Sequence, residues 1–367
     1  MRDFMNNYSI YLPSYTIGTS SYDSIERICS PYGSKIIAIG GKRAMEAAKP
    51  YLDLALEASK LMISDYLWYG GEASYENVEA LSTHPLVQDA DMIFAIGGGK
   101  ALDTCKALSI KLHKPIFTFP TIASTCAACT TVSIMYRPDG SFIEPYFFDI
   151  PPVHTFIHTA ILAAAPSKYL WAGIGDTYAK YYEASISGRN EELVHYNALG
   201  ICMSRMCVDP LLQYGAKAYQ DNVDHHCSYE LEQTILAIIV TTAIVSILVT
   251  KEHTADYNSG LAHAIFYALT SFKEIEEHHL HGEVVGFGVL ILLLVDQNID
   301  EFKKIYELNK SIGLPVSLED INITESMLQE ILPIITKMPD LRHYPYNVSV
   351  EMLQDAFDRL NNFQLID

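Results

Sequence analysis

The sequence predicts two regions of different architecture, an α/β domain with a largely parallel sheet followed by an all-α domain. Up to about residue 160, short apolar runs alternate with longer stretches of helical periodicity, which is the pattern of βαβ units. Beyond that point the chain is mostly periodic helix with few clusters of turn residues. The length of 367 residues exceeds what one hydrophobic core usually organises, and a hydrophobic fraction of 49% can fill two cores.

Four apolar runs are predicted to be strands of the sheet. They span Lys35–Ile39, Met62–Leu67, Asp91–Ile96 and Ile116–Phe119. Glycines follow three of these strands, at Gly40-Gly41, Gly70-Gly71 and Gly97-Gly98-Gly99. Because ligands of open α/β sheets bind outside the carboxyl ends of the strands, we expect a binding site at this edge.

The change of architecture is expected between Thr159 and Pro166, which gives domains of residues 1–160 and 161–367. Pro166-Ser167-Lys168 has the composition of a helix start. In the second region, Ile235–Val249 is the most apolar stretch. A membrane span needs about twenty apolar residues and this stretch has about fifteen, so we expect a buried core helix and no membrane partner.

Charge and cysteine usage narrow the class of protein. A formal net charge of −19 is the opposite of what binding to a phosphate backbone requires, so we expect no nucleic-acid partner. The residues Met1-Arg2-Asp3-Phe4 begin no apolar stretch of the kind that directs secretion. Seven cysteines with irregular spacing are typical of reduced thiols. These observations predict a cytoplasmic protein without a nucleic-acid partner.

The glycine run after the third predicted strand is a candidate phosphate-binding turn. Gly97-Gly98-Gly99 precedes Lys100-Ala101-Leu102-Asp103, which has the composition of a helix start. Glycines let backbone N–H groups approach a pyrophosphate, and a helix N-terminus adds about half a positive charge. The spacing matches neither G-x-G-x-x-G nor the P-loop, so an ordinary turn with positive φ remains an alternative. Pro120–Thr125 offers hydroxyls and amides after the next strand, with a simple Ser/Thr turn as its alternative.

Three residues far apart in the chain, Asp176, His263 and His281, lie in contexts that suit a divalent-metal site. The contexts are Gly173-Ile174-Gly175-Asp176, Leu261-Ala262-His263-Ala264 and His281-Gly282-Glu283. One carboxylate and two imidazoles suit Zn²⁺ or Fe²⁺ and leave a coordination position for a reacting oxygen. Taken singly, Asp176 could instead be a helix N-cap, and either histidine could be a hydrogen-bonded core residue. We expect the nearby His278 and His279 to surround the site or face solvent, without binding metal.

In the order and spacing of these motifs, the sequence resembles the iron-containing alcohol dehydrogenase family and, within it, the glycerol dehydrogenase branch. The resemblance covers nearly the whole chain through Gly71–Ser74, Gly97–Asp103, Pro120–Thr125, Gly173–Asp176, Ala262–Ile265 and His281–Glu283. It implies a dinucleotide-binding domain, a helical domain and a metal in the cleft between them, held by Asp176, His263 and His281. The metal is expected to be zinc, with iron or nickel as alternatives, and the enzyme to be an NAD(P)-dependent homo-oligomer.

The same resemblance, together with the strand ends, gives the expected cofactor contacts. They are Gly40, Gly41, Lys42, Gly97, Gly98, Gly99, Lys100, Asp103, Thr121, Ser124, Thr130, Val132 and Tyr136. NAD-preferring members place an acidic residue after the first strand to hold the ribose 2′-hydroxyl, but this chain has Gly41-Lys42-Arg43 there. These cations would suit a 2′-phosphate, so we expect NADP(H) rather than NAD(H). The alternative is that both cations merely begin a solvated helix.

Two departures from the glycerol dehydrogenase pattern bear on the substrate. Cys126 stands where that branch has an aspartate that receives a polyol hydroxyl, and Tyr267 stands where it has a further histidine. Two negative charges 4 Å apart repel by about 4 kcal/mol at an effective dielectric near 20, so losing the aspartate admits an anionic substrate. The Thr-Cys-Ala-Ala run resembles a hydroxycarboxylate dehydrogenase subgroup.

We therefore expect hydride transfer between NAD(P)H and a 2-oxo acid, forming a 2-hydroxy acid, with Asp176, His263, His281 and Cys126 at the reacting centre. The main alternative is an NAD-dependent glycerol dehydrogenase. A lyase of the dehydroquinate synthase type and a catalytically silent nucleotide-binding protein are the other two alternatives. A redox or metal role for Cys126 and Cys129 is also open, although no second cysteine pair completes a zinc site.

Overall fold

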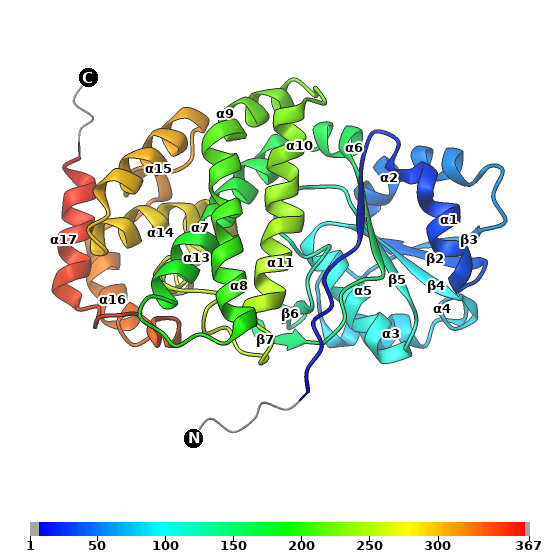
Figure 1. Cartoon of the computed structure of the whole chain (residues 1–367), viewed down its shortest axis with the longest axis horizontal. Helices are drawn as coiled ribbons and strands as arrows, with labels where there is room; N and C mark the ends of the chain where they lie inside the picture. Colours follow the sequence, from blue (N-terminus) through cyan, green and yellow to red (C-terminus); the bar gives the residue numbers. More distant parts are fainter. Residues whose placement is uncertain (1–6, 364–367) are drawn as a thin grey trace.

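The computed structural model describes residues 7–363, and its first half is built around a six-stranded parallel sheet (Figure 1). The strand order is β1-β8-β5-β4-β2-β3. The bounds are β1 Tyr15–Gly18, β2 Lys35–Gly40, β3 Met62–Trp68, β4 Met92–Gly97, β5 Ile116–Pro120 and β8 His154–His158. The four predicted strands are therefore β2, β3, β4 and β5, each within one residue of its predicted ends. The N-terminal residues considered for a secretion signal lie outside the described part of the chain.

Burial on both faces explains why these segments form a parallel sheet. All six residues of β4 and all five of β5 are buried, as expected for strands covered on both sides. Along β2, Ile36 and Ala38 pack in one apolar cluster, whereas Ile37 and Ile39 pack in another, because successive side chains point to opposite faces.

Helices cover both faces of the sheet. The first cluster contains residues of α1 and α2, and the second contains residues of α3, α4 and α5. Their bounds are α1 Ile25–Cys29, α2 Lys42–Leu56, α3 Tyr75–Ser82, α4 Pro85–Asp89 and α5 Gly99–Leu112, with short 3₁₀ turns at Ser21–Ser24 and Ser30–Tyr32. An antiparallel hairpin of β6 Val132–Tyr136 and β7 Phe142–Phe147 projects from this half toward the helices.

The second half is helical, and α7 begins at Ser167 with Pro166 as its N-cap residue, as predicted. The α-helices are α6 Thr159–Ala163, α7 Ser167–Ser187, α8 His195–Met203, α9 Asp209–Val223, α10 Tyr229–Leu236, α11 Thr242–Val249, α12 Leu261–Leu269, α13 Lys273–His278, α14 His281–Val295, α15 Ile299–Ile312, α16 Glu325–Ile335 and α17 Val350–Asn361. Short 3₁₀ turns lie at Ser204–Cys207, Glu319–Ile321 and Pro339–Leu341.

One segment, Tyr229–Val249, is long and apolar enough to cross a membrane by length and composition. It comprises α10, a π-helical turn at Ala237–Thr241 and α11. Ile235, Ile238 and Ile239 are fully buried inside the protein, so in this structure the segment is a core helix.

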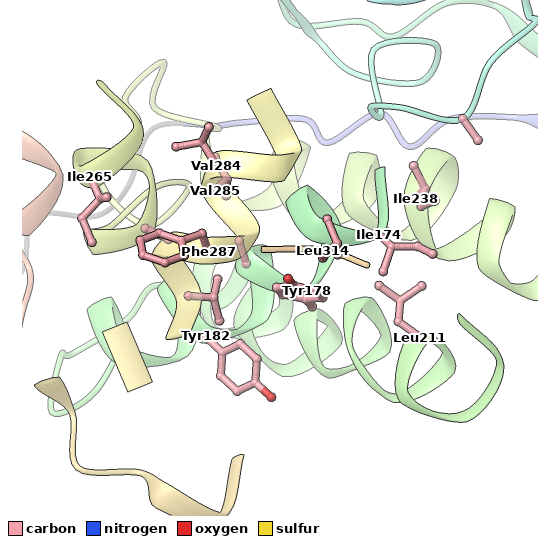
Figure 2. Close-up of a cluster of buried hydrophobic side chains, with 14 of the residues drawn as sticks. Ile174, Tyr178, Tyr182, Leu211, Ile238, Ile265, Val284, Val285, Phe287 and Leu314 are labelled. Carbon is pink, nitrogen blue, oxygen red and sulfur yellow. The ribbon is translucent and has the colours of Figure 1, made fainter. Parts of the chain in front are cut away.

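The largest apolar cluster extends from the face of the sheet that α3, α4 and α5 cover into the helical half. Figure 2 draws part of this cluster, in which Ile174, Tyr178 and Tyr182 come from α7 and Val285 and Phe287 come from α14. The change from strand to helix falls where the sequence predicts it, between β8 and α7. The division into two domains at residue 160 remains a prediction, since the packing across it is continuous.

Candidate metal and dinucleotide site

Asp176, His263 and His281 meet at one point, although 105 residues separate the first from the last in sequence numbering (281 minus 176). Asp176 comes from the middle of α7, His263 from the first turn of α12 and His281 from the start of α14. Asp176 Oδ1 lies 3.3 Å from His281 Nε2 and 3.6 Å from His263 Nε2. One candidate ligand atom from each residue lies within 4.8 Å of the other two. The N-cap alternative for Asp176 is wrong, because the residue is inside a helix.

The close approach of α7 to α14 places Asp176 opposite His281. A Cβ atom on Gly175 would lie 2.1 Å from the Gly282 carbonyl oxygen, and one on Gly282 would lie 1.9 Å from the Ala172 carbonyl oxygen. Only glycine permits this backbone contact. The glycines beside the predicted ligands therefore serve helix packing.

His281 is held in place at the start of α14 by Glu283. The Glu283 carboxylate accepts the Leu280 N–H at 2.9 Å and contacts His279 Nδ1 at 2.8 Å. His278 is exposed on α13, and its Nδ1 bonds the Glu274 carbonyl. Neither His278 nor His279 enters the cluster of candidate ligands.

Glu183, which the sequence analysis missed, fixes the orientation of His263. Its side chain is fully buried, one carboxylate oxygen lies 2.7 Å from His263 Nδ1, and the other accepts the His263 backbone N–H at 2.9 Å. A proton held at Nδ1 leaves the Nε2 lone pair directed at Asp176. The spacing contained a signal, because residues 176 and 183 are two helical turns apart and share one face of α7.

The electrostatics of the cluster suit a divalent cation. Burial lowers the pKa of His263, but the Glu183 and Asp176 carboxylates outweigh burial and raise that pKa to about 10. Burial raises the pKa of Asp176, but the two histidines hold it well below its usual range. The buried Glu183 and the half-buried Asp176 thus favour positive charge at the point where two imidazole nitrogens converge. This donor set fits Zn²⁺, Fe²⁺ or Ni²⁺.

The predicted phosphate-binding glycines lie together at the carboxyl edge of the sheet. The Gly41 N–H donates to the Ile96 carbonyl at 3.3 Å, and the Thr121 N–H donates to the Gly97 carbonyl at 3.2 Å. The turns after β2, β4 and β5 are therefore adjacent. Gly97 has φ of +152°, which favours glycine, and a Cβ on Gly98 would lie 2.5 Å from Ile122 Cδ1. The 14-residue helix α5 begins at this point.

The other predicted cofactor residues divide into two groups. The first group surrounds Lys106, a buried lysine that the sequence analysis missed. The Lys106 ammonium lies 2.9 Å from the Asp103 carboxylate and 2.9 Å from Thr130 Oγ1, and it also donates to the Val132 carbonyl. Lys100 is exposed at the start of α5, where it pairs with Glu72 and lies 5.4 Å from the centre of the Tyr136 ring. Thr121 is buried after β5 and Ser124 is half-buried.

Cys126 lies near the three candidate metal ligands and is a neutral thiol. Burial and the Asp176 carboxylate raise its pKa to about 11. Cys129 is buried, donates to Thr155 Oγ1 at 3.2 Å, and has a pKa raised by burial to about 12. Reactive cysteines have lowered pKa values, so these two thiols do not have the electrostatics of a redox pair.

A cavity of about 230 Å³ joins the cluster to the hairpin β6–β7. Its lining includes His263 and His281 from the cluster, Val132 and Tyr136 from β6, and Tyr267 from α12. Phe266, Asn258 and Ser259 complete the side near α12, and no acidic residue, lysine or arginine is among the described residues that line it. The cavity is therefore bounded by residues predicted to hold metal and by residues predicted to touch cofactor.

The glycerol dehydrogenase of Thermotoga maritima is 32% identical to this chain over 292 residues, which are 76% of this chain and 75% of the relative. The chain belongs to the iron-containing alcohol dehydrogenase family. The family model for iron-containing alcohol dehydrogenases matches residues 13–149. Hydroxycarboxylate dehydrogenase A of Escherichia coli is 28% identical over 336 residues, 90% of each chain.

Solved structures agree with the family assignment. A probable glycerol dehydrogenase from Sinorhizobium meliloti superimposes with a TM-score of 0.78 at 25% identity, covering 97% of this chain and 98% of that one. The glycerol dehydrogenase of Schizosaccharomyces pombe, at 23% identity, shares the fold with a TM-score of 0.81 and covers 97% of this chain and 91% of that one. The protein is thus an NAD(P)-dependent, metal-containing dehydrogenase.

Proposed function

We propose that Asp176, His263 and His281 hold one divalent metal, and that the enzyme interconverts a small alcohol and its carbonyl compound at this metal. The observation that carries the proposal is the convergence of the three side chains, with candidate ligand atoms within 4.8 Å of one another, beside a cavity that also reaches β6. In the reducing direction, NAD(P)H, one proton and the carbonyl compound give NAD(P)⁺ and the alcohol.

When bound, the metal supplies a Lewis acid for the substrate oxygen, and the nicotinamide supplies the two electrons as hydride. The protein positions the metal ligands and fixes the tautomer of His263. Glu183 keeps the proton of His263 at Nδ1, so that Nε2 is available as a ligand. Phe266 and Tyr267 form part of the cavity wall and reduce the access of water to the reacting centre.

For the cofactor, we propose that the pyrophosphate lies at the Gly97–Gly99 turn and the N-terminus of α5, within reach of the Gly41 turn. The first turn of α2 is Lys42-Arg43, both exposed and without an acidic residue, which supports NADP(H) over NAD(H). Lys42 lies 4.9 Å from the centre of the Trp68 ring, so its side chain is directed toward the end of β3. Zinc, with iron or nickel as alternatives, is the proposed metal.

Two substrates remain as candidates. Glycerol has the stronger support from relatives, since those from Thermotoga maritima, Pseudomonas putida and other organisms are named glycerol dehydrogenases. A 2-oxo acid has support from one relative, hydroxycarboxylate dehydrogenase A, and from one feature of the site. That feature is Cys126, which leaves a neutral thiol near Asp176 where a carboxylate would repel an anionic substrate.

The test uses purified protein of known metal content, with NADPH or NADH against dihydroxyacetone, simple aldehydes and 2-oxobutanoate, and with NADP⁺ or NAD⁺ against glycerol. Metal-dependent oxidation of reduced cofactor by any of these carbonyl compounds supports the proposed function. Full activity after chelation of all metal would overturn it. A homo-oligomeric, cytoplasmic enzyme without nucleic-acid or membrane partners completes the proposal, and light scattering tests the oligomeric state.

A further inference from the structure

Lys180 is a buried lysine without a carboxylate partner. It lies on α7, one turn after Asp176, and is 7% exposed. Its ammonium donates to the backbone carbonyl and to Oδ1 of Asn258, the latter at 2.9 Å, and among residues 7–363 no carboxylate oxygen lies within 4.0 Å of it. Lys106, the other buried lysine near the site, has Asp103 at 2.9 Å.

A buried ammonium ion usually requires an anion and full hydrogen bonding, because burial removes its hydration. The two bonds to Asn258 use two of the three N–H donors of Lys180. Asp176 and Glu183, on the same face of α7, are engaged with His263 and His281. One N–H donor of Lys180 and its uncompensated positive charge are thus left for a ligand.

Asn258 connects Lys180 to the cavity. Its side chain lines the cavity that holds His263 and His281, and its Oδ1 is occupied by Lys180. Within the described chain the amide Nδ2 of Asn258 has no hydrogen-bond partner, so its N–H bonds are available to a ligand in the cavity. An anion in the cavity would therefore meet an amide N–H polarised by the lysine behind it.

Lys180 lies beside a proposed metal ligand on α7. Side chains four residues apart on a helix have Cβ atoms about 5–6 Å apart, so Asp176 and Lys180 are neighbours on α7. Lys180 also lies near enough to Cys126 to oppose the burial and the Asp176 charge that raise the pKa of that thiol. The region between Asp176, Cys126 and Lys180 thus contains one neutral thiol and one lysine ammonium that has no carboxylate partner within the described residues.

We propose that Lys180 and Asn258 form the subsite for a substrate carboxylate that is bonded directly to the reacting carbonyl carbon. The enzyme then acts on a 2-oxo acid and 2-hydroxy acid pair in preference to a neutral diol. Asn258 contacts the carboxylate, and Lys180 supplies the charge and positions the amide. This inference rests on the proposed function, because it assumes that the carbonyl oxygen binds at the cluster of Asp176, His263 and His281.

The test compares 2-oxobutanoate with 2-oxobutanamide, a substrate pair that differs in charge at one position. The wild-type holoenzyme is expected to prefer the acid, and Lys180→Met to lower the ratio of the two kcat/KM values by about 100-fold, because the carboxylate loses the attraction of the buried ammonium behind Asn258. Lys180→Arg restores part of the ratio if charge is the cause. Lys310→Met, which removes an exposed positive charge on α15, leaves the ratio unchanged.

Binding of oxamate to the metal-loaded enzyme with NADP(H), measured by calorimetry, gives a second readout that does not require turnover. Lys180→Met should weaken it at least about tenfold. Equal losses for the acid and the amide, or unchanged oxamate binding, would overturn the subsite. A wild type that reduces dihydroxyacetone but shows no preference for the acid also overturns it, even if the variants fail to fold, and leaves the proposed function standing. Inactivity toward every carbonyl compound would instead overturn the proposed function.

Discussion

The sheet edge proposed to bind the dinucleotide and the cluster of three proposed metal ligands both bring together residues that are distant in sequence, but they do so by different means. At the edge, parallel strands deliver the Gly41, Gly97 and Thr121 turns to the same side because every strand runs in the same direction. At the cluster, no such rule applies, and Asp176 meets His281 only because α7 and α14 touch through glycine. Sheet topology makes the first site predictable, whereas the second depends on the details of helix packing.

The largest expected effect comes from the ligands themselves. His263→Ala or Asp176→Ala should abolish turnover, because each variant removes a third of the proposed ligand set. Binding of NADPH at the sheet edge should be nearly unchanged, since neither residue lies there. Steady-state kinetics and fluorescence titration of NADPH measure the two quantities. Wild-type turnover by the metal-stripped variants would refute the assignment of the ligands.

Glu183→Gln is expected to weaken metal binding by about 10- to 100-fold while cofactor binding stays as it is. The variant loses the charge that favours a cation, and because its amide N–H₂ can only donate, either the Nδ1 proton or the backbone N–H of His263 loses its acceptor. Competition with a chelator measures metal affinity. Glu330→Gln, exposed on α16, is the control for the loss of one charge. A metal affinity equal to that of the control would show that Glu183 is only a structural residue.

Gly175→Ala should affect the proposed metal site and not the sheet edge, because it changes the packing of α7 against α14. Its Cβ would lie 2.1 Å from the Gly282 carbonyl oxygen, so α7 and α14 must move apart, at a cost of about 1–3 kcal/mol in the free energy of unfolding. Metal affinity should fall with it. Gly215→Ala on α9 is the matched control, because its nearest neighbour would be at 3.5 Å. Denaturant unfolding and metal titration decide the outcome, and similar stability losses in both variants would contradict this account of the helix contact.

The smallest effect is expected at the sheet edge. Lys42→Ala should weaken binding of NADPH about tenfold relative to NADH, because the ammonium would face the 2′-phosphate. Separate dissociation constants for the two cofactors provide the measurement, with the exposed Lys49 on the same helix as a control site. If Lys42→Ala changes neither constant, the cation belongs to a solvated helix start, and the preference for NADP(H) loses its support.

The sequence was sufficient for the elements that follow simple patterns. β2, β4 and β5 are nearly continuous apolar runs, and they were placed within one residue. β1 and β8 were missed because β1 is a short, half-buried edge strand and β8 begins and ends with histidine, which interrupts the apolar pattern.

Buried charges were the least predictable part of the candidate site. The resemblance led to Asp176, His263 and His281, and the structure brings them together. Lys106, Lys180 and Glu183 were missed because charged residues in a helix are usually exposed, and their burial depends on partners elsewhere in the chain. Only the spacing of Asp176, Lys180 and Glu183 at i, i+4 and i+7 indicated a polar stripe on an otherwise apolar helix.

The polar stripe of Asp176, Lys180 and Glu183 determines how the activity of this protein can change in evolution. A proposed metal ligand, the residue that orients a second ligand and the proposed selector of substrate charge all belong to one 21-residue helix. Substitution or exchange of this single segment would alter metal affinity and substrate preference together, while the segments proposed to contact the dinucleotide would retain their sequence. New substrate specificities are therefore accessible through very few changes, provided that the glycines against α14 are kept.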